Sequence, residues 1–164
     1  EPADLPRFGR FGVAASVQPV HLRSDAVQER EAWGIRAEET IPLRGLLAGG
    51  ALIPFGTDAP VEPSDPWSGI AVAVARRDPF DERAVPLGID HAISVERAIR
   101  AACVDPAIIA GRPDLGRLTP GCIADLIVVP AAAAEDAPDP AHLASVRPLS
   151  RLPDGAIVHG GLDP

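Results

Sequence analysis

The sequence contains no Lys, and all 15 of its basic residues are Arg. They are outnumbered by 23 acidic residues, so the formal net charge is −8 and the isoelectric point lies near 4.9. A nucleic-acid-binding surface would require clustered cations. The charge balance therefore argues against a nucleic-acid partner.

Aromatic residues and long apolar runs are also scarce. Aromatics make up only 4% of a chain that is 46% hydrophobic, so the core must be built largely from Ala, Val, Ile and Leu. No apolar run approaches the roughly 18 residues of a membrane span, and we expect no signal peptide. We therefore expect a cytoplasmic protein with no membrane partner.

Cysteine is limited to Cys103 and Cys122, which have neither a CxxC spacing nor a nearby His pair. This argues against a zinc knuckle. Cys103 lies in an apolar helical run, so we expect it to be a buried free thiol. The four histidines form neither HxH nor HExxH.

The length of 164 residues suits one domain with a real core. It is too short for a complete (β/α)₈ barrel, which needs roughly 250 residues. Because the first residue is Glu1 rather than Met, we expect the chain to begin inside a longer gene product.

The first third of the chain alternates helical and apolar patterns. Residues 13–17 and 51–56 are short apolar runs typical of buried strands. Helical patterns at residues 24–33 and 38–47 separate them, and a short helix is expected at residues 4–11. Strand, helix and strand in this order favour a parallel βαβ unit.

Two later helices have clear starts. Asp65 can cap the free amides of the next helix, and Pro66 suits its first position. Ser94 is a candidate N-cap for a helix over residues 95–103. The residues between these helices, 76–90, read as a polar loop.

The pattern changes after Gly111, so we expect an α/β part over residues 1–111 and a mostly β part over residues 112–164. Residues 124–129 are the clearest strand of the second part, and the Ala-, Asp- and Pro-rich residues 131–140 are expected to form an exposed loop. A terminal hairpin is predicted from residues 146–152 and 156–159, which flank a Pro-Asp-Gly turn.

Asp58 is the strongest candidate for chemistry. It follows a buried apolar strand, where a parallel sheet presents its functional side chains. A carboxylate there could bind a metal and take a proton from a bound water. A turn-forming or helix-capping Asp is the alternative.

His21 occupies the equivalent place after the other strand. An imidazole there could bind a metal, transfer a proton or hydrogen-bond a substrate. A structural or surface histidine remains the alternative for His21, and a surface position is expected for His91, His142 and His159.

Three stretches together resemble the amidohydrolase superfamily, and within it the family 3 (YtcJ-like) branch. Their order and rough spacing match over nearly the whole chain. They are Ala-Ser-Val-Gln-Pro-Val-His at residues 15–21, Phe-Gly-Thr-Asp-Ala-Pro-Val at 55–61, and Leu-Gly-Arg-Leu followed by Pro-Gly-Cys-Ile-Ala-Asp-Leu within 115–126.

The resemblance implies the C-terminal strands and helices of a (β/α)₈ TIM barrel plus part of a small β-sandwich domain. Residues 13–17 would be the seventh barrel strand and residues 51–56 the eighth. Asp58 would be both a metal ligand and the general base and acid, with zinc as the expected divalent metal. His21 would lie close to the substrate.

The other metal ligands of the family, an HxH motif, a bridging ligand and further histidines, have no counterpart in this sequence. One carboxylate cannot hold a catalytic zinc, which takes about three protein ligands. We therefore expect the C-terminal portion of a metal-dependent amidohydrolase that hydrolyses non-peptide carbon–nitrogen bonds of a small-molecule amide with a metal-activated water. The chain alone should be catalytically incomplete and inactive.

Two alternatives remain: a degenerate stand-alone half-barrel that acts as a binding or assembly module, and a truncated gene without a separate role. A pair of barrel strands would expose both of its edges. The chain is therefore expected to pair with a missing N-terminal barrel part or with a second copy of itself.

Overall fold

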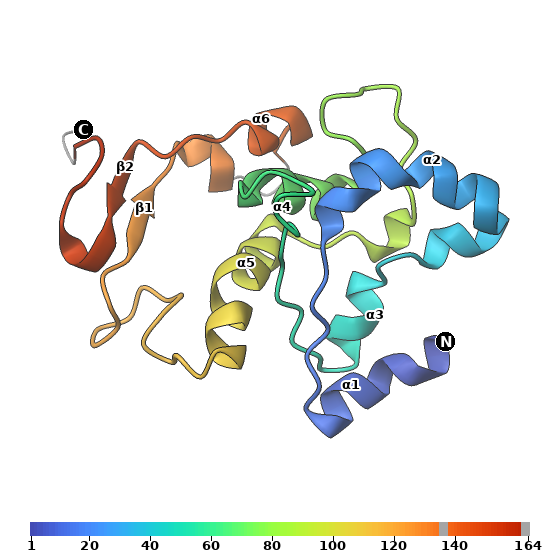
Figure 1. The fold of residues 1–164 in the computed structure, drawn as a ribbon, viewed down its shortest axis with the longest axis horizontal. Coiled ribbons are helices and arrows are strands. Elements are labelled where there is room, and N and C mark those ends of the chain that lie inside the picture. Colours follow the sequence, from blue (N-terminus) through green and yellow to red (C-terminus); the bar gives the residue numbers. More distant parts are fainter. Residues whose placement is uncertain (135–137, 162–164) are drawn as a thin grey trace.

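The computed structural model describes residues 1–134 and 138–161. The α-helices run α1 Leu5–Phe11, α2 Leu22–Trp33, α3 Leu43–Ala48, α4 Pro66–Ala75, α5 Val95–Ile109 and α6 Pro140–Ala144. The strands are β1 Leu126–Val128 and β2 Ser150–Leu152, and the 3₁₀ turns are η1 Pro2–Asp4, η2 Pro19–His21, η3 Gly34–Glu39, η4 Ile89–His91, η5 Ala131–Ala134 and η6 Pro153–Gly155. The chain is thus a mixed α/β structure, with α4 and α5 at its centre (Figure 1).

Helix α4 is the centre of the core, and its start is the one that the sequence predicts. Asp65 accepts a hydrogen bond from the Trp67 amide at 3.0 Å, and Pro66 takes the first helical position. The helix is apolar all round, which is typical of a fully buried helix. Its residues Trp67, Ile70, Ala71 and Ala73 pack with buried residues of α3, α5 and α6.

Residues 13–17 and 51–56, hereafter the first and second extended segments, run side by side in parallel. The amide of Val17 donates to the carbonyl of Pro54 at 3.1 Å, and the amide of Gly56 donates to the carbonyl of Val17 at 3.0 Å. A parallel bridge joins Val17 to Phe55. The predicted parallel pairing is confirmed, although the pairing is too short for either segment to form a regular strand.

The prediction that both edges of this pair would be exposed is wrong for the second extended segment. On the side away from the first segment, the amide of Phe55 donates to the carbonyl of Ala101 in α5 at 2.9 Å. The amide of Ile53 also has a partner in α5. Helix α5 therefore closes this edge.

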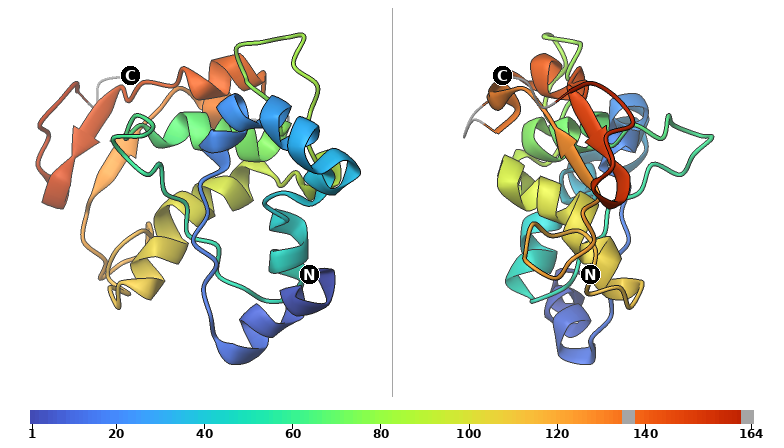
Figure 2. Two further views of the ribbon diagram at one scale, coloured as in Figure 1. Left: turned by 45° about the vertical axis from the view of Figure 1, so that its right-hand side comes forward. Right: turned by 90° about the vertical axis from the view of Figure 1, so that its left-hand side faces the viewer.

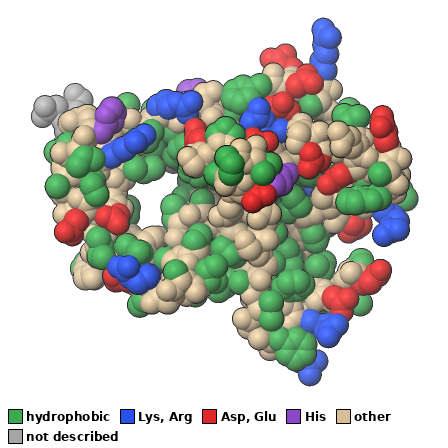
Figure 3. Space-filling view, in the orientation of Figure 1, with side chains coloured by type: hydrophobic (Ala, Val, Ile, Leu, Met, Phe, Trp, Pro, Cys, Tyr) green, Lys and Arg blue, Asp and Glu red, His purple; other side chains and the backbone are tan. Residues whose placement is uncertain are grey.

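The C-terminal region projects from the helical body (Figure 2). Strands β1 and β2 are antiparallel, with Ile127 opposite Arg151, and a further bridge joins Arg151 to His159. The predicted strand and terminal hairpin are therefore present in shortened form. Figure 3 shows an opening between this projecting arm and the helices. A domain boundary near Gly111 stays a prediction.

Other details differ from the sequence-based expectations. The helix expected over residues 38–47 begins only at Leu43, because Ile41 has a positive φ of 45° and Pro42 lies at the N-cap. Helix α5 begins after Ser94 as predicted but continues through Pro106 to Ile109.

Two further expectations, about which residues are buried and which are exposed, are wrong. Cys103 is exposed rather than buried, because it lies on the outer face of α5. The expected exposed loop over residues 131–140 instead begins with η5, whose Ala133 is only 1% exposed and packs in the core. Residues 135–137 of that loop lie outside the described residues. No helix within the described ranges is both long and apolar enough to cross a membrane.

Candidate functional site

Asp58 lies in an exposed turn directly after the second extended segment. Its φ of 57° is in the left-handed region, which Asp, Asn and His adopt more readily than most other side chains. The turn is closed by a hydrogen bond of 2.9 Å from the Val61 amide to the Asp58 carbonyl. Within residues 1–134 and 138–161, the Asp58 carboxylate has no hydrogen-bond or ion-pair partner, so its oxygens face solvent and are accessible to a ligand.

His21 lies in η2, directly after the first extended segment. The turn is fixed because the buried Val20 and Leu22 anchor it on either side of the histidine. The His21 amide donates to the carbonyl of Gln18 at 3.2 Å. Its ring nitrogen Nε2 is buried and has no hydrogen-bond partner among the residues that the structure describes, an unusual state for a buried polar group.

The parallel pairing brings the ends of the two extended segments together. His21 follows the bridged Val17 by four residues, and Asp58 follows the bridged Phe55 by three. A methyl group added at Gly56 would lie 3.9 Å from the side-chain nitrogen of Gln18. The two stretches of the chain are therefore still adjacent one residue beyond the bridge. The residues that the sequence singles out therefore leave the same end of the same pair of segments.

These donors do not make a metal site on their own. In the described part of the chain, no group of three or more His, Cys, Asp or Glu side chains could hold a metal ion. A catalytic zinc needs about three protein ligands. Asp58 and the unpartnered His21 ring fit only as parts of a site that other residues complete.

We therefore expect the 164-residue chain to bind zinc only weakly. Zinc added to metal-free protein and followed by calorimetry should give no stoichiometric, high-affinity transition, since two donors leave the ion mostly hydrated. Tight binding at one zinc per chain would contradict the incomplete ligand set.

A buried arginine, which could not be singled out from the sequence, joins two loops of the scaffold. Arg76 ends α4 and is fully buried. Its guanidinium donates to three main-chain carbonyls, those of Leu87 at 3.0 Å, Ile41 at 3.2 Å and Thr40. Burial lowers the pKa of Arg76 to about 10, which leaves the group charged at neutral pH, and Glu29 and Glu38 oppose the shift.

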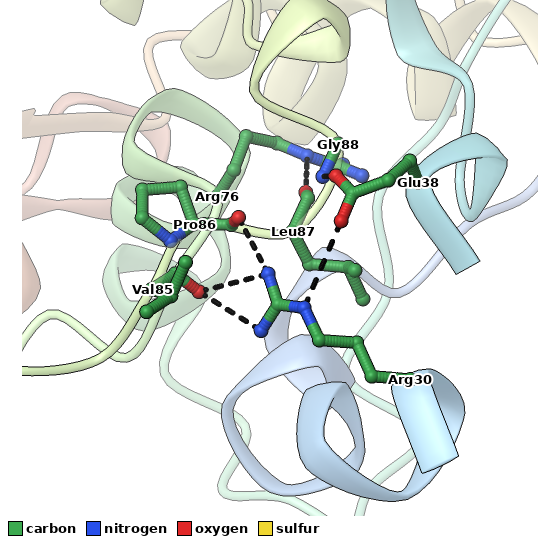
Figure 4. Close-up of polar contacts among 7 residues, drawn as sticks. All are labelled: Arg30, Glu38, Arg76, Val85, Pro86, Leu87 and Gly88. Carbon is green, nitrogen blue, oxygen red and sulfur yellow. Dashed lines mark hydrogen bonds and ion pairs between the residues drawn. The ribbon is translucent and has the colours of Figure 1, made fainter. Parts of the chain in front are cut away.

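A second arginine reinforces the same loop (Figure 4). Arg30 of α2 donates to the carbonyls of Val85 and Pro86, and it pairs with Glu38 at 3.7 Å. Glu38 in turn accepts a hydrogen bond from the Gly88 amide at 2.6 Å. Residues 85–88 are thus attached to α2, η3 and α4, which makes the polar loop predicted from sequence a fixed part of the scaffold.

The remaining histidines lie apart from Asp58 along the chain. His142 and His159 are exposed, as predicted. His91 is half-buried and faces the Glu39 carboxylate at 3.3 Å.

Comparison with known proteins decides the family. Residues 1–159 match the profile of the Amidohydrolase family. The chain belongs to this family. It is 34% identical to the protein LONG AFTER FAR-RED 3 of Arabidopsis thaliana over 132 residues, which cover 78% of this chain and 22% of that protein. It is 28% identical to YtcJ of Bacillus subtilis over 157 residues, which cover 94% of this chain and 29% of that protein.

A solved structure shows the same relationship. An uncharacterized metal-dependent hydrolase from Pyrococcus horikoshii is 29% identical and superposes with a TM-score of 0.65 over 76% of this chain and 25% of that one. This chain therefore has the same fold as part of that metal-dependent hydrolase. The chain spans about a quarter of the length of the relatives it matches. The alternative of a degenerate binding or assembly module is not favoured by these matches.

Proposed function

We propose that this chain forms the C-terminal part of the TIM barrel of a metal-dependent amidohydrolase, together with part of a small β-sandwich. The barrel part is residues 1–111 and the sandwich part is residues 112–164. The complete enzyme hydrolyses a non-peptide carbon–nitrogen bond in a small-molecule amide. The observation that supports the proposal is the parallel pairing of the two extended segments, because Asp58 and His21 both follow the same end of this pair.

Asp58 is the residue to which we assign proton transfer and metal ligation. A divalent metal, which we propose to be zinc, would lower the pKa of a bound water and polarise the substrate carbonyl. The exposed Asp58 carboxylate would accept the proton from the attacking water and deliver it to the leaving nitrogen. Its solvent-facing oxygens support this role, because no arginine within the described residues occupies either of them, and one oxygen can bind the metal while the other accepts the proton.

His21 is the residue to which we assign substrate binding. Its buried and unpartnered Nε2 lacks a hydrogen bond in the described structure, and a substrate carbonyl or anion would supply one. The remaining ligands would come from a separate part of the protein. The unpaired Cys103 and Cys122 support a reducing, cytoplasmic location.

Release of amine by the active protein that contains this chain tests the proposal. A panel of N-acylated amines and N-substituted ureas would be incubated with the protein, and new amine would be detected by fluorescence labelling. We expect turnover that is lost after dialysis against a chelator and restored by zinc or another divalent cation. Turnover that survives complete removal of metal would contradict the proposed function.

A further inference from the structure

Helix α5 carries one acidic side chain on its buried face. Asp105 is fully buried, although ionisable side chains are almost never buried without a partner. Its Oδ2 accepts hydrogen bonds from the Ile53 amide at 3.1 Å and from the Arg97 guanidinium at 2.6 Å. Arg100 lies 3.7 Å from the other carboxylate oxygen.

The buried Asp105 carboxylate binds the amide of Ile53, which lies in the second extended segment. Successive residues of an extended chain turn their amides to opposite edges. Gly56 donates its amide toward the first extended segment, whereas Ile53 and Phe55 donate theirs toward α5. Asp105 and the Ala101 carbonyl therefore replace a neighbouring strand along this edge.

The two acceptors come from the buried face of α5. Ala101 and Asp105 are both buried residues of this helix and lie four residues apart, which places them on the same face. Ala101 lies one turn earlier, and the Phe55 amide donates to its carbonyl at 2.9 Å. A buried carboxylate is costly unless it is well paired, and Arg97 supplies the pairing charge.

We propose that Asp105 is a positioning residue for Asp58. It fixes the second extended segment at Ile53, and the chain then runs through Phe55 to Asp58, about 15 Å of extended backbone beyond the anchor. The inference rests on the role proposed for Asp58. Asp105 itself does not touch the substrate, because it is enclosed between α5 and the second extended segment.

Amide hydrogen exchange in the 164-residue chain measures the anchor itself. In an Asp105→Ala variant, exchange of the Ile53 amide should become at least about tenfold faster, since the amide loses the acceptor that Asp105 provides and opens locally. Asp105→Asn keeps an acceptor oxygen and should restore most of the protection. Glu96→Leu, which removes an exposed acid from the same helix, should leave the Ile53 amide unchanged.

Kinetics of the active protein that contains this chain measure the positioning. Asp105→Ala should lower kcat about tenfold or more while KM stays within about threefold, because a misplaced general base affects the chemical step. Asp105→Asn should recover most of kcat. If Asp105→Ala does not fold, Arg97→Gln provides the same test, because it removes the group that holds the carboxylate.

Each result bears on one claim. Unchanged exchange at Ile53 in Asp105→Ala would overturn the anchor. A normal kcat in Asp105→Ala, in a protein that Asp58→Asn inactivates, would overturn the positioning role and leave the proposed function standing. Full activity of Asp58→Asn would overturn the proposed function and the positioning role with it.

Discussion

Replacement of Asp58 with Asn is expected to abolish turnover of the active protein that contains this chain. The amide has the shape of the carboxylate but carries no charge for the metal and cannot accept the proton. Loss of a general base and a metal ligand together is expected to lower kcat by a factor on the order of 10³ or more. The fold should survive, because Asn adopts the positive φ of Asp58 as readily as Asp does.

Asp154→Asn is the matched control for this substitution. Asp154 is also exposed and also has a positive φ, of 48°, but it lies in η6 next to the hairpin. Its turn is held by its backbone amide, which donates to Asp125 at 2.8 Å, so the side-chain change should be silent. Turnover of Asp58→Asn within tenfold of the unmodified protein would show that Asp58 is only a turn residue.

Replacement of Arg76 with Leu is expected to cause the largest loss of stability. The carbonyls of Thr40, Ile41 and Leu87 would lose their donor in a buried environment. An unsatisfied buried polar group costs about 1–3 kcal/mol, so the free energy of unfolding should fall by about 3 kcal/mol or more. Urea denaturation followed by circular dichroism would measure the change.

Arg44→Leu provides the control, because Arg44 is exposed on α3. It should change the free energy of unfolding by less than about 0.5 kcal/mol.

Burial lowers the pKa of Arg76 to about 10, so the folded and unfolded chains bind different numbers of protons at this site only above roughly that pH. The loss in Arg76→Leu should therefore be the same between pH 6 and 8. A loss below 1 kcal/mol would mean that the loop does not depend on this arginine.

The helix starts were predictable because their signals are local. Asp65 and Ser94 accept hydrogen bonds from amides two and three residues away, and Pro66 occupies the first helical position, so their roles can be read directly from the sequence. The start of α3 was missed for the opposite reason. Ile41 has a positive φ and its carbonyl accepts a hydrogen bond from the distant Arg76, and no local preference of an isoleucine indicates either.

At the candidate site too, the features with local signals were predictable and those that depend on distant contacts were not. Apolar runs followed by polar residues were enough to select Asp58 and His21. The partners that hold the second extended segment and the start of α3 lie far along the chain: Asp105 is 52 residues from Ile53, and Arg76 is 35 residues from Ile41. One signal for Asp105 was present, namely an acid followed by Pro106 within an otherwise apolar helical stretch. Burial of Ala133 had no such signal, because an Ala-rich tract fits a core as well as a loop.

The crystal structure, with divalent metal, of the active protein that contains this chain would test the role of Asp58 most directly. We expect an Asp58 carboxylate oxygen about 2.0–2.2 Å from the metal. We also expect the His21 ring at the same end of the paired segments, with Nε2 turned toward the substrate space. A bound metal with no Asp58 oxygen in its coordination shell would contradict the role of Asp58 as a metal ligand.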